Sequence, residues 1–169
     1  HALGLKVMMD IVINHSSPDN VWVSSHPDYY LRDSRGRLMN KVSDWTDVAD
    51  FDYRSKALRK ELIKMLCYWA DQGADAYRCD VASLVPADFW VDARAAVAKR
   101  HPGFLWMAES VESDMILEMR RGGWGIDSDP ELCRAFDILY SYDTESWLNR
   151  SLADENLTEY ERIINYREA

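Results

Sequence analysis

The chain has little of several features that mark specialised classes of protein. It holds 3 cysteines in 169 residues and no Cys-x-x-Cys pair, and an odd number without a disulfide framework favours a reducing compartment. No apolar run reaches the roughly 18 residues of a membrane span, and no secretory signal is visible. With 20 Lys and Arg against 29 Asp and Glu, the net charge of −9 argues against a nucleic-acid surface. We therefore expect a cytoplasmic globular protein with no nucleic-acid or membrane partner.

Two carboxylates stand at the ends of two short apolar runs. Asp80 lies at the end of the run 74–81, Glu109 follows the run 104–108, and a helical pattern at 87–100 separates them. A strand, a crossover and a second strand predict parallel neighbours, whose carboxyl ends share one face of a sheet. Two acids at those ends can approach each other over a substrate, about 5–5.5 Å apart in retaining glycosidases.

A guanidinium lies beside the first of these carboxylates. Arg78 precedes Asp80 by two residues, so both side chains point to the same side of the strand, and the positive charge favours an ionised carboxylate. Asp10 interrupts a further apolar run, 5–13, which is typical of a strand buried on both faces. Because a charge inside a buried strand needs a partner, we expect Asp10 to pair with Arg78.

Three segments resemble, in order, the first three signatures of the α-amylase family of glycoside hydrolases. In that family the second signature carries the nucleophile and the third carries the general acid/base. Each segment alone is weak evidence, whereas three in order, with helices of suitable length between them, are specific. The stretch 45–53 is also similar to the one that leads from the family's inserted domain back to its barrel, and the resemblance runs from residue 4 to about 147. The three segments are 10–15, 77–81 and 107–110.

The resemblance implies an α/β fold, the (β/α)8 TIM barrel. A whole barrel takes about 250 residues, or roughly 30 per strand–helix unit, so 169 residues predict an incomplete central portion, truncated at both ends. The expected parts are the third barrel strand within 1–15, a short inserted domain over 16–54, and the fourth to sixth strand–helix units over 55–169. The expected strands are 5–13, 76–81, 104–108 and 135–140, and the expected helices lie between Ser55 and Gly73 and at 87–100, 114–121 and 157–169.

The resemblance also gives each candidate residue a role. Asp80 is the expected nucleophile and Glu109 the expected general acid/base; the plain alternatives are a structural acid paired to Arg78 and a helix cap. Arg78, His15 and Asp10 are the expected substrate-binding residues. His15 would bond the sugar at the cleavage point, although a lone histidine is more often structural, and Asp10 would orient Arg78.

Asn14 raises the question of a metal ion. It matches a residue that binds calcium in some members of the family. The expected chemistry requires no cofactor, and calcium at Asn14 would need several more oxygen ligands, for example from Asp44 or Asp47. The sequence does not place those ligands.

The assigned roles imply cleavage of α-glucosidic bonds by a retaining double displacement, with an oligosaccharide or α-glucan as the bound partner. Ser83 and Leu84 stand where many starch-degrading members have Lys and His, and Val81 resembles members that act on α-1,6 linkages. We therefore expect short α-glucans, either malto- or isomalto-oligosaccharides, as substrates.

Three alternatives stay open. A transglycosylase of the same family would differ only in what intercepts the intermediate. A metal-dependent hydrolase would use Asp10, His15, Asp80 and Glu109 as ligands, but one His on the candidate strands and the lack of a His-x-His pair disfavour it. The third alternative is a non-catalytic sugar-binding or structural module.

The family's fourth signature, a short Asn-His-Asp segment that supplies a third carboxylate, does not occur in the chain. A run of four barrel strands would also leave two edges of unpaired backbone groups. We therefore expect the 169-residue chain alone to be inactive, and the complete site to need the missing barrel portions.

Overall fold

The computed structural model describes residues 1–153, 158 and 160–162. Most of the helix expected at 157–169 lies outside the described residues. Among the described helices, none is long and apolar enough to cross a membrane. In chain order the elements are β1 (Met8–Ile11), β2 (His15–Ser16), α1 (Val21–Ser25), the 3₁₀ turn η1 (Pro27–Tyr29), β3 (Ala49–Asp50), α2 (Lys56–Asp71), β4 (Ala76–Cys79), the 3₁₀ turn η2 (Ala82–Leu84), α3 (Ala87–Ala98), β5 (Leu105–Ala108), α4 (Ser113–Arg121), α5 (Asp129–Leu132), β6 (Ile138–Leu139) and α6 (Tyr142–Ala153).

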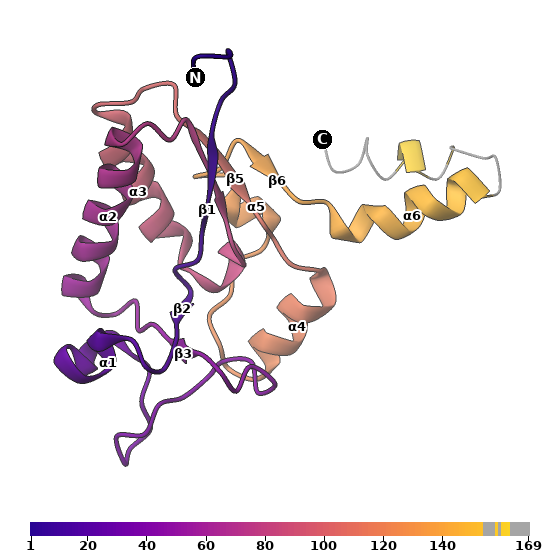
Figure 1. The fold of residues 1–169 in the computed structure, drawn as a ribbon. Coiled ribbons are helices and arrows are strands. Elements are labelled where there is room, and N and C mark those ends of the chain that lie inside the picture. The colour runs from indigo at the N-terminus through magenta and orange to yellow at the C-terminus, as the bar shows by residue number, and fades with distance from the viewer. Residues whose placement is uncertain (154–157, 159, 163–169) are drawn as a thin grey trace.

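The main sheet has four parallel strands in the order β1, β4, β5, β6 (Figure 1). Its register aligns Asp10 with Arg78, and Arg78 with Met107. Helices α2 and α3 lie in the connections from β1 to β4 and from β4 to β5, as parallel neighbours require. The α/β class and the adjacency of the two acid-bearing strands are therefore confirmed.

The strands are shorter than the sequence suggests. Residues 135–140 were expected to form one strand, but the N–H groups of Ala135 and Phe136 donate to the carbonyl of Leu132 at the end of α5. Those residues close a turn, and the ladder with β5 is limited to the paired residues Ile138 and Leu139 and the N–H groups of Asp137 and Tyr140, which donate to β5 carbonyls. Backbone groups already bonded within a turn cannot join a ladder, which is why the apolar pattern overestimates strand length.

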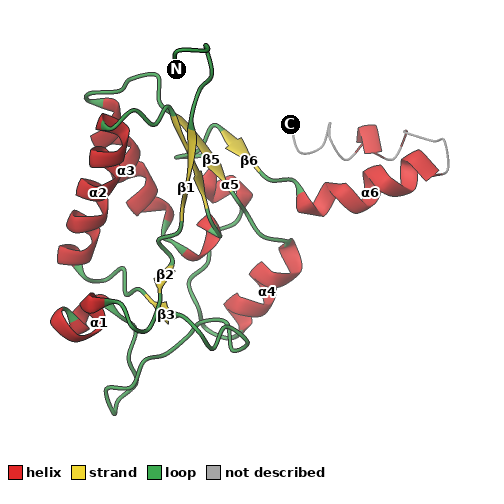
Figure 2. Cartoon of the chain, viewed as in Figure 1, coloured by secondary structure: helices red, strands yellow, loops and turns green. Residues whose placement is uncertain are grey.

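One face of the sheet is covered by helices α2 and α3 (Figure 2). Tyr77 and Trp106 point to this face, and both are essentially inaccessible to solvent. The hydroxyl of Tyr77 donates to the carbonyl of Leu66 in α2, and the Trp106 ring lies 6.3 Å from that of Trp90 in α3. Buried aromatic side chains of this size supply much of the apolar area that a small domain removes from water.

The opposite face of the sheet is largely open in the described chain. Met8, Leu105 and Ile138 point to it and keep 36–40% of their surface exposed. The expectation that β1 is buried on both faces is therefore wrong for the described residues. The helices α2 and α3 cover one face of the sheet, and no described helix covers the other. Side chains on this open face form the interior when such a sheet closes into a barrel.

Helix α2 follows its sequence signals closely. The Ser55 side chain caps it by accepting the N–H of Leu58, and apolar residues at intervals of four form the buried stripe. Gly73, with φ of +106°, takes the left-handed conformation that ends the helix at little steric cost. The buried residues of the stripe are Leu58, Leu62, Leu66 and Ala70.

The segment 16–54 folds against the sheet through a short antiparallel pair, β2 with β3. Its aromatic residues Tyr29 and Tyr30 are buried and pack with Phe51 and Trp22. These side chains join the main apolar core, so this part of the segment is anchored to the sheet that carries the candidate site.

Candidate active site

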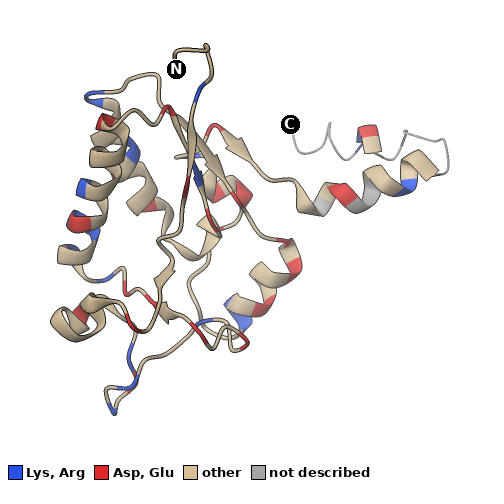
Figure 3. Ribbon diagram, in the orientation of Figure 1, with Lys and Arg blue, Asp and Glu red and all other residues tan. Residues whose placement is uncertain are grey.

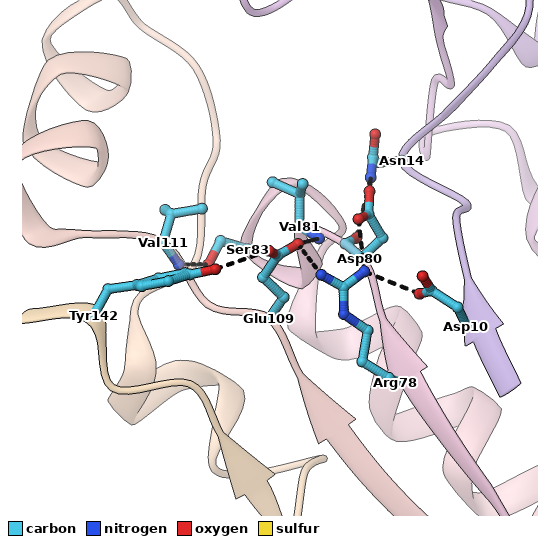
Figure 4. Close-up of polar contacts among 9 residues, drawn as sticks. All are labelled: Asp10, Asn14, Arg78, Asp80, Val81, Ser83, Glu109, Val111 and Tyr142. Atoms are coloured by element: carbon cyan, nitrogen blue, oxygen red, sulfur yellow. Dashed lines mark hydrogen bonds and ion pairs between the residues drawn. The ribbon is translucent and has the colours of Figure 1, made fainter. Parts of the chain in front are cut away.

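The carboxyl ends of β4 and β5 bring Asp80 and Glu109 to the same guanidinium (Figure 4). Arg78 Nη1 donates to Asp80 Oδ1 at 2.7 Å, and its Nη2 lies 2.8 Å from Glu109 Oε2. Nη1 also donates to Asp10 Oδ1 at 2.9 Å, so the predicted pairing of Asp10 with Arg78 is present. The structure thus brings together four of the residues selected from the sequence, on one face of the sheet.

Arg78 is held between charge and an aromatic ring. Its side chain is 19% exposed, and its guanidinium carbon lies 5.6 Å from the centre of the Tyr140 ring. Burial lowers the pKa of Arg78, but the hydrogen bond with Tyr140 and the interactions with Asp10, Asp80 and Glu109 outweigh it and raise the pKa above its ordinary value. Arg78 is therefore a fixed positive charge at the centre of the site.

Asp80 is also held by hydrogen bonds from Asn14, which lies between β1 and β2. The Asn14 amide donates to the Asp80 backbone carbonyl at 3.0 Å and to its Oδ2 at 3.3 Å. Arg78 binds the other carboxylate oxygen. Because both oxygens and the backbone are held, the carboxylate has a defined orientation before substrate arrives.

Glu109 is held by groups from three different elements. Its Oε2 accepts the backbone N–H of Val81 at 3.0 Å, and its Oε1 accepts the Tyr142 hydroxyl at 3.1 Å. Val81 adopts a left-handed conformation with φ of 39°, which is strained for a β-branched residue and turns its N–H toward Glu109. The alternative reading of Glu109 as a helix cap is wrong, since Glu112 is the N-cap residue of α4.

Arg78 contacts both Asp80 and Glu109, whereas the sequence predicted it as a partner of Asp80 and Asp10 but not of Glu109. The guanidinium therefore does not by itself distinguish a nucleophile from an acid. The difference between the two sites lies in their other partners: an amide from Asn14 at Asp80, and the Val81 N–H and Tyr142 hydroxyl at Glu109. Burial and the hydrogen bond to Glu109 raise the pKa of Tyr142, so this hydroxyl stays protonated and can donate.

His15 stands apart from this network. It lies in β2, and its ring meets Trp45 edge to face at a centroid distance of 5.8 Å. Within the described residues its Nδ1 is buried without a hydrogen-bond partner. The structure does not bring His15 to Arg78 or Glu109 through any described contact, and its role toward a sugar stays a prediction.

The turn after Asp80 carries the two residues on which the expectation about substrate length rests. Ser83 and Leu84 are both buried, and Leu84 also borders a surface cavity. The Ser83 hydroxyl accepts the N–H of Val111 at 3.4 Å, and Leu84 packs against Ile116 of α4. These two residues join the turn to the segment after β5, and the expectation about substrate length stays a prediction.

Calcium fits the described residues poorly. Asp44 and Asp47, the further ligands considered from the sequence, are exposed, and no group of three or more His, Cys, Asp or Glu that could hold a metal occurs among the described residues. Asn14 Oδ1 is buried without a hydrogen-bond partner, but one amide oxygen falls far short of the six to eight ligands that calcium takes. No step of the chemistry is assigned to a metal.

Sequence reasoning missed two groups that complete the site, Tyr140 and Tyr142. Both follow β6, the strand next to β5, and polar residues just after a parallel strand are placed at the same end of the sheet as Asp80 and Glu109. That rule, applied to the run ending at residue 139, would have selected them.

The known proteins that resemble this chain belong to one family. No family model matches the chain. The crystal structure of an alpha-amylase from Lactobacillus plantarum is 44% identical and superposes with a TM-score of 0.91 over 99% of this chain and 40% of that one. A noncanonic maltogenic alpha-amylase, AmyB, from Thermotoga neapolitana is 36% identical, with a TM-score of 0.77 over 99% of this chain and 36% of that one.

A transferase is also similar in sequence. The alpha-1,4-glucan:maltose-1-phosphate maltosyltransferase of Bifidobacterium longum is 30% identical over 115 residues, which are 65% of this chain and 15% of that protein. The chain thus spans well under half the length of each of these relatives. Two solved alpha-amylases match almost all of it, including the strand ends where Arg78 joins Asp80 and Glu109, and the chain belongs to the α-amylase family of glycoside hydrolases.

Proposed function

We propose that the protein cleaves α-glucosidic bonds in short α-glucans, malto- or isomalto-oligosaccharides, by a retaining double displacement. The observation that carries the proposal is the shared guanidinium: Arg78 holds Asp80 and Glu109 together at the ends of adjacent parallel strands. This is the placement that a nucleophile and an acid/base need on either side of one glycosidic bond. The relatives named for α-1,4-glucan and maltose favour an α-glucan as substrate.

In the first half of the reaction, a carboxylate oxygen of Asp80 attacks the anomeric carbon. The glycosidic C–O bond breaks as the Glu109 carboxyl gives its proton to the departing oxygen, which leaves a covalent glycosyl ester on Asp80. Asn14 and Arg78 hold the Asp80 carboxylate from opposite sides, which orients the attacking oxygen.

In the second half, the Glu109 carboxylate takes a proton from water. The water oxygen attacks the anomeric carbon, and Asp80 is released as a carboxylate. The Val81 N–H and the Tyr142 hydroxyl hold the two Glu109 oxygens, so the same side chain can act first as acid and then as base without leaving its place.

Glu109→Gln in the full-length protein tests the assignment of the acid. The variant should be slowed most, by about 10³-fold, on natural oligosaccharides whose poor leaving groups need protonation. An aryl α-glucoside with an activated leaving group should lose much less in the first step. Equal losses on both kinds of substrate would show that Glu109 is not the acid.

Transfer in place of hydrolysis is the second candidate, because a maltosyltransferase is among the relatives. A sugar hydroxyl or phosphate would then replace water in the second step, with the same roles for Asp80 and Glu109. Product analysis with maltotriose separates the two, since hydrolysis yields only shorter sugars and transfer also yields longer ones.

We further infer that the 169-residue chain does not turn over substrate by itself. Its open sheet face exposes apolar side chains, and Asp10 at the edge strand β1 keeps 62% of its side-chain surface exposed. A bare face and a free strand edge favour association over a closed cleft. The purified chain should show no activity on maltotriose, isomaltose or an aryl α-glucoside, and should sediment as an aggregate. A soluble monomer with ordinary enzyme rates would overturn this inference.

A further inference from the structure

A partly buried lysine joins the inserted segment to the turn behind Asp80. Lys41 lies in the segment 16–54, and its ammonium donates to the carbonyl of Leu84, the last residue of η2, at 2.9 Å. Its backbone N–H donates to Asp50 Oδ2 at 2.6 Å. One residue therefore bonds both to β3 and to the turn that follows Asp80.

The charge of Lys41 is balanced by acids in a poorly solvated place. Burial lowers the pKa of Lys41, and the negative charges of Asp50 and Asp52 oppose that change. Asp50 is 3% exposed, and burial raises its pKa while the N–H and the charge of Lys41 oppose the rise. Each group therefore compensates the other, and removing one leaves an uncompensated buried charge.

This junction lies beside the residue for which the sequence suggested calcium. Asp50 pairs in the β2–β3 ladder with His15, which directly follows Asn14. An ammonium already bound to an oxygen at this junction disfavours a divalent cation in the same place, because the two positive charges repel. Leu84 O, an acceptor of the kind that calcium binds, already receives the Lys41 ammonium.

The turn that Lys41 holds also positions Glu109. Leu84 N–H donates to the Val81 carbonyl within η2, and the Ala82 N–H donates to the backbone carbonyl of Glu109 at 2.9 Å. Val81 N–H in turn donates to the Glu109 carboxylate. A shift of η2 would therefore move both the backbone and the carboxylate of Glu109.

We propose that the Lys41 ammonium is the internal cation that fixes the inserted segment to η2, that this junction needs no calcium ion, and that Lys41 thereby acts as a positioning residue for Asp80 and Glu109. The effect on turnover rests on the proposed function. The junction itself does not, so its stability can be tested without an assay.

The first test is thermal unfolding of the full-length protein with Lys41→Met. Lys60→Met is the matched control, since Lys60 is an exposed lysine that lines the same surface cavity as Lys41. Lys60 belongs to α2, a helix whose ribbon carries blue Lys and Arg positions in Figure 3. Lys41→Met should lower Tm by on the order of 10 °C, and Lys60→Met by less than about 2 °C. Lys41→Gln, which keeps a donor for Leu84 without the charge, should fall between them and serves if the Met variant is insoluble. Equal Tm values for the Lys41 and Lys60 variants would overturn the proposal.

The second test measures Tm in the same unfolding experiment with and without calcium. Excess calcium and a chelator should give the wild-type protein the same Tm. A calcium-dependent rise in Tm that Asn14→Ala removes would place a calcium site at this junction and overturn the proposal.

Kinetics then separate positioning from stability. Well below its Tm, Lys41→Met should lose about 10-fold in kcat with KM within twofold of wild type, whereas Lys60→Met should change neither. An unchanged kcat for Lys41→Met would show that the lysine only stabilises the fold. If Asp80→Asn retained full activity, the proposed function would fail, while the unfolding result for Lys41 would still stand.

Discussion

Neighbouring residues on the same strands face two very different environments. Tyr77 and Trp106 point to the helix-covered face, where less than about 2% of their surface is exposed, and they make aromatic contacts with α3 and the core. Arg78, one residue later in β4, points to the open face and holds three carboxylates. The period of two in a strand therefore separates the residues that stabilise the sheet from those that carry its chemistry. Substitutions on the two faces should divide in the same way.

The largest effect is expected at the open face, from Asp80→Asn. This variant keeps the shape of the side chain but removes the nucleophile, so turnover in the full-length protein should fall by about 10⁴-fold or more. Its Tm should stay within about 3 °C of the wild type, because no core contact is lost. Asp47→Asn, at an exposed position outside the network, is the control and should keep full activity. A large drop in Tm for Asp80→Asn would mean that Asp80 is chiefly a structural partner of Arg78.

Substitutions on the helix-covered face should chiefly lower the free energy of unfolding, not turnover. Trp106→Ala removes a side chain that is 1% exposed, and the lost burial and the cavity should lower the free energy of unfolding by about 3–5 kcal/mol. Leu105→Ala, one residue earlier and 36% exposed, should cost roughly 1 kcal/mol if its contacts are those of the described chain alone. Urea unfolding measures both. In the full-length protein, a cost near 3 kcal/mol for Leu105→Ala would show that further chain covers the open face.

The residues that local sequence placed correctly are those whose position follows from strand ends. Asp80 and Glu109 each end a short apolar run with a helical pattern between them, and this was enough to predict adjacent parallel strands and a shared face. The pairing of Arg78 with Asp10 was also predicted correctly, but the assumed cause was wrong, because Asp10 keeps 62% of its side-chain surface exposed in the described chain and is not a buried charge.

Contacts between distant segments were beyond local patterns. Tyr142 reaches Glu109 across 33 positions, and Lys41 reaches Leu84 across 43. The strand-end rule would place Tyr142 at the same end of the sheet as Glu109 but does not give their contact, and no such rule links Lys41 to Leu84, because these contacts depend on how α6 and the inserted segment pack. The sharing of Arg78 by Glu109 has the same origin, since it depends on the register of β4 with β5.

Arg78→Lys separates the effect of charge from that of geometry at the open face. It keeps the positive charge but removes the planar guanidinium with its two donor nitrogens. A lysine ammonium cannot hold Asp80 and Glu109 at two separate nitrogens, so the two carboxylates should lose their mutual placement. We expect kcat/KM to fall by about 10²-fold with Tm lowered by only a few degrees. Arg94→Lys, at an ion pair with Asp137 between α3 and the residue before β6, is the matched control and should leave kcat/KM unchanged. Full activity in Arg78→Lys would show that the charge alone is sufficient.

Tyr142→Phe is expected to have the smallest effect, and it tests whether the open-face network extends to α6. The variant removes only the hydroxyl that donates to Glu109 Oε1 at 3.1 Å. A hydrogen bond of this kind contributes about 1 kcal/mol, so kcat should fall by roughly fivefold with little change in KM. The loss should be larger on natural oligosaccharides than on an activated aryl α-glucoside, because the hydroxyl acts through the acid that protonates the leaving group. Tyr160→Phe, which removes the same hydroxyl from a partly exposed position, should leave both rates unchanged. Equal losses on the two substrates would indicate that Tyr142 acts on the sugar and not through Glu109.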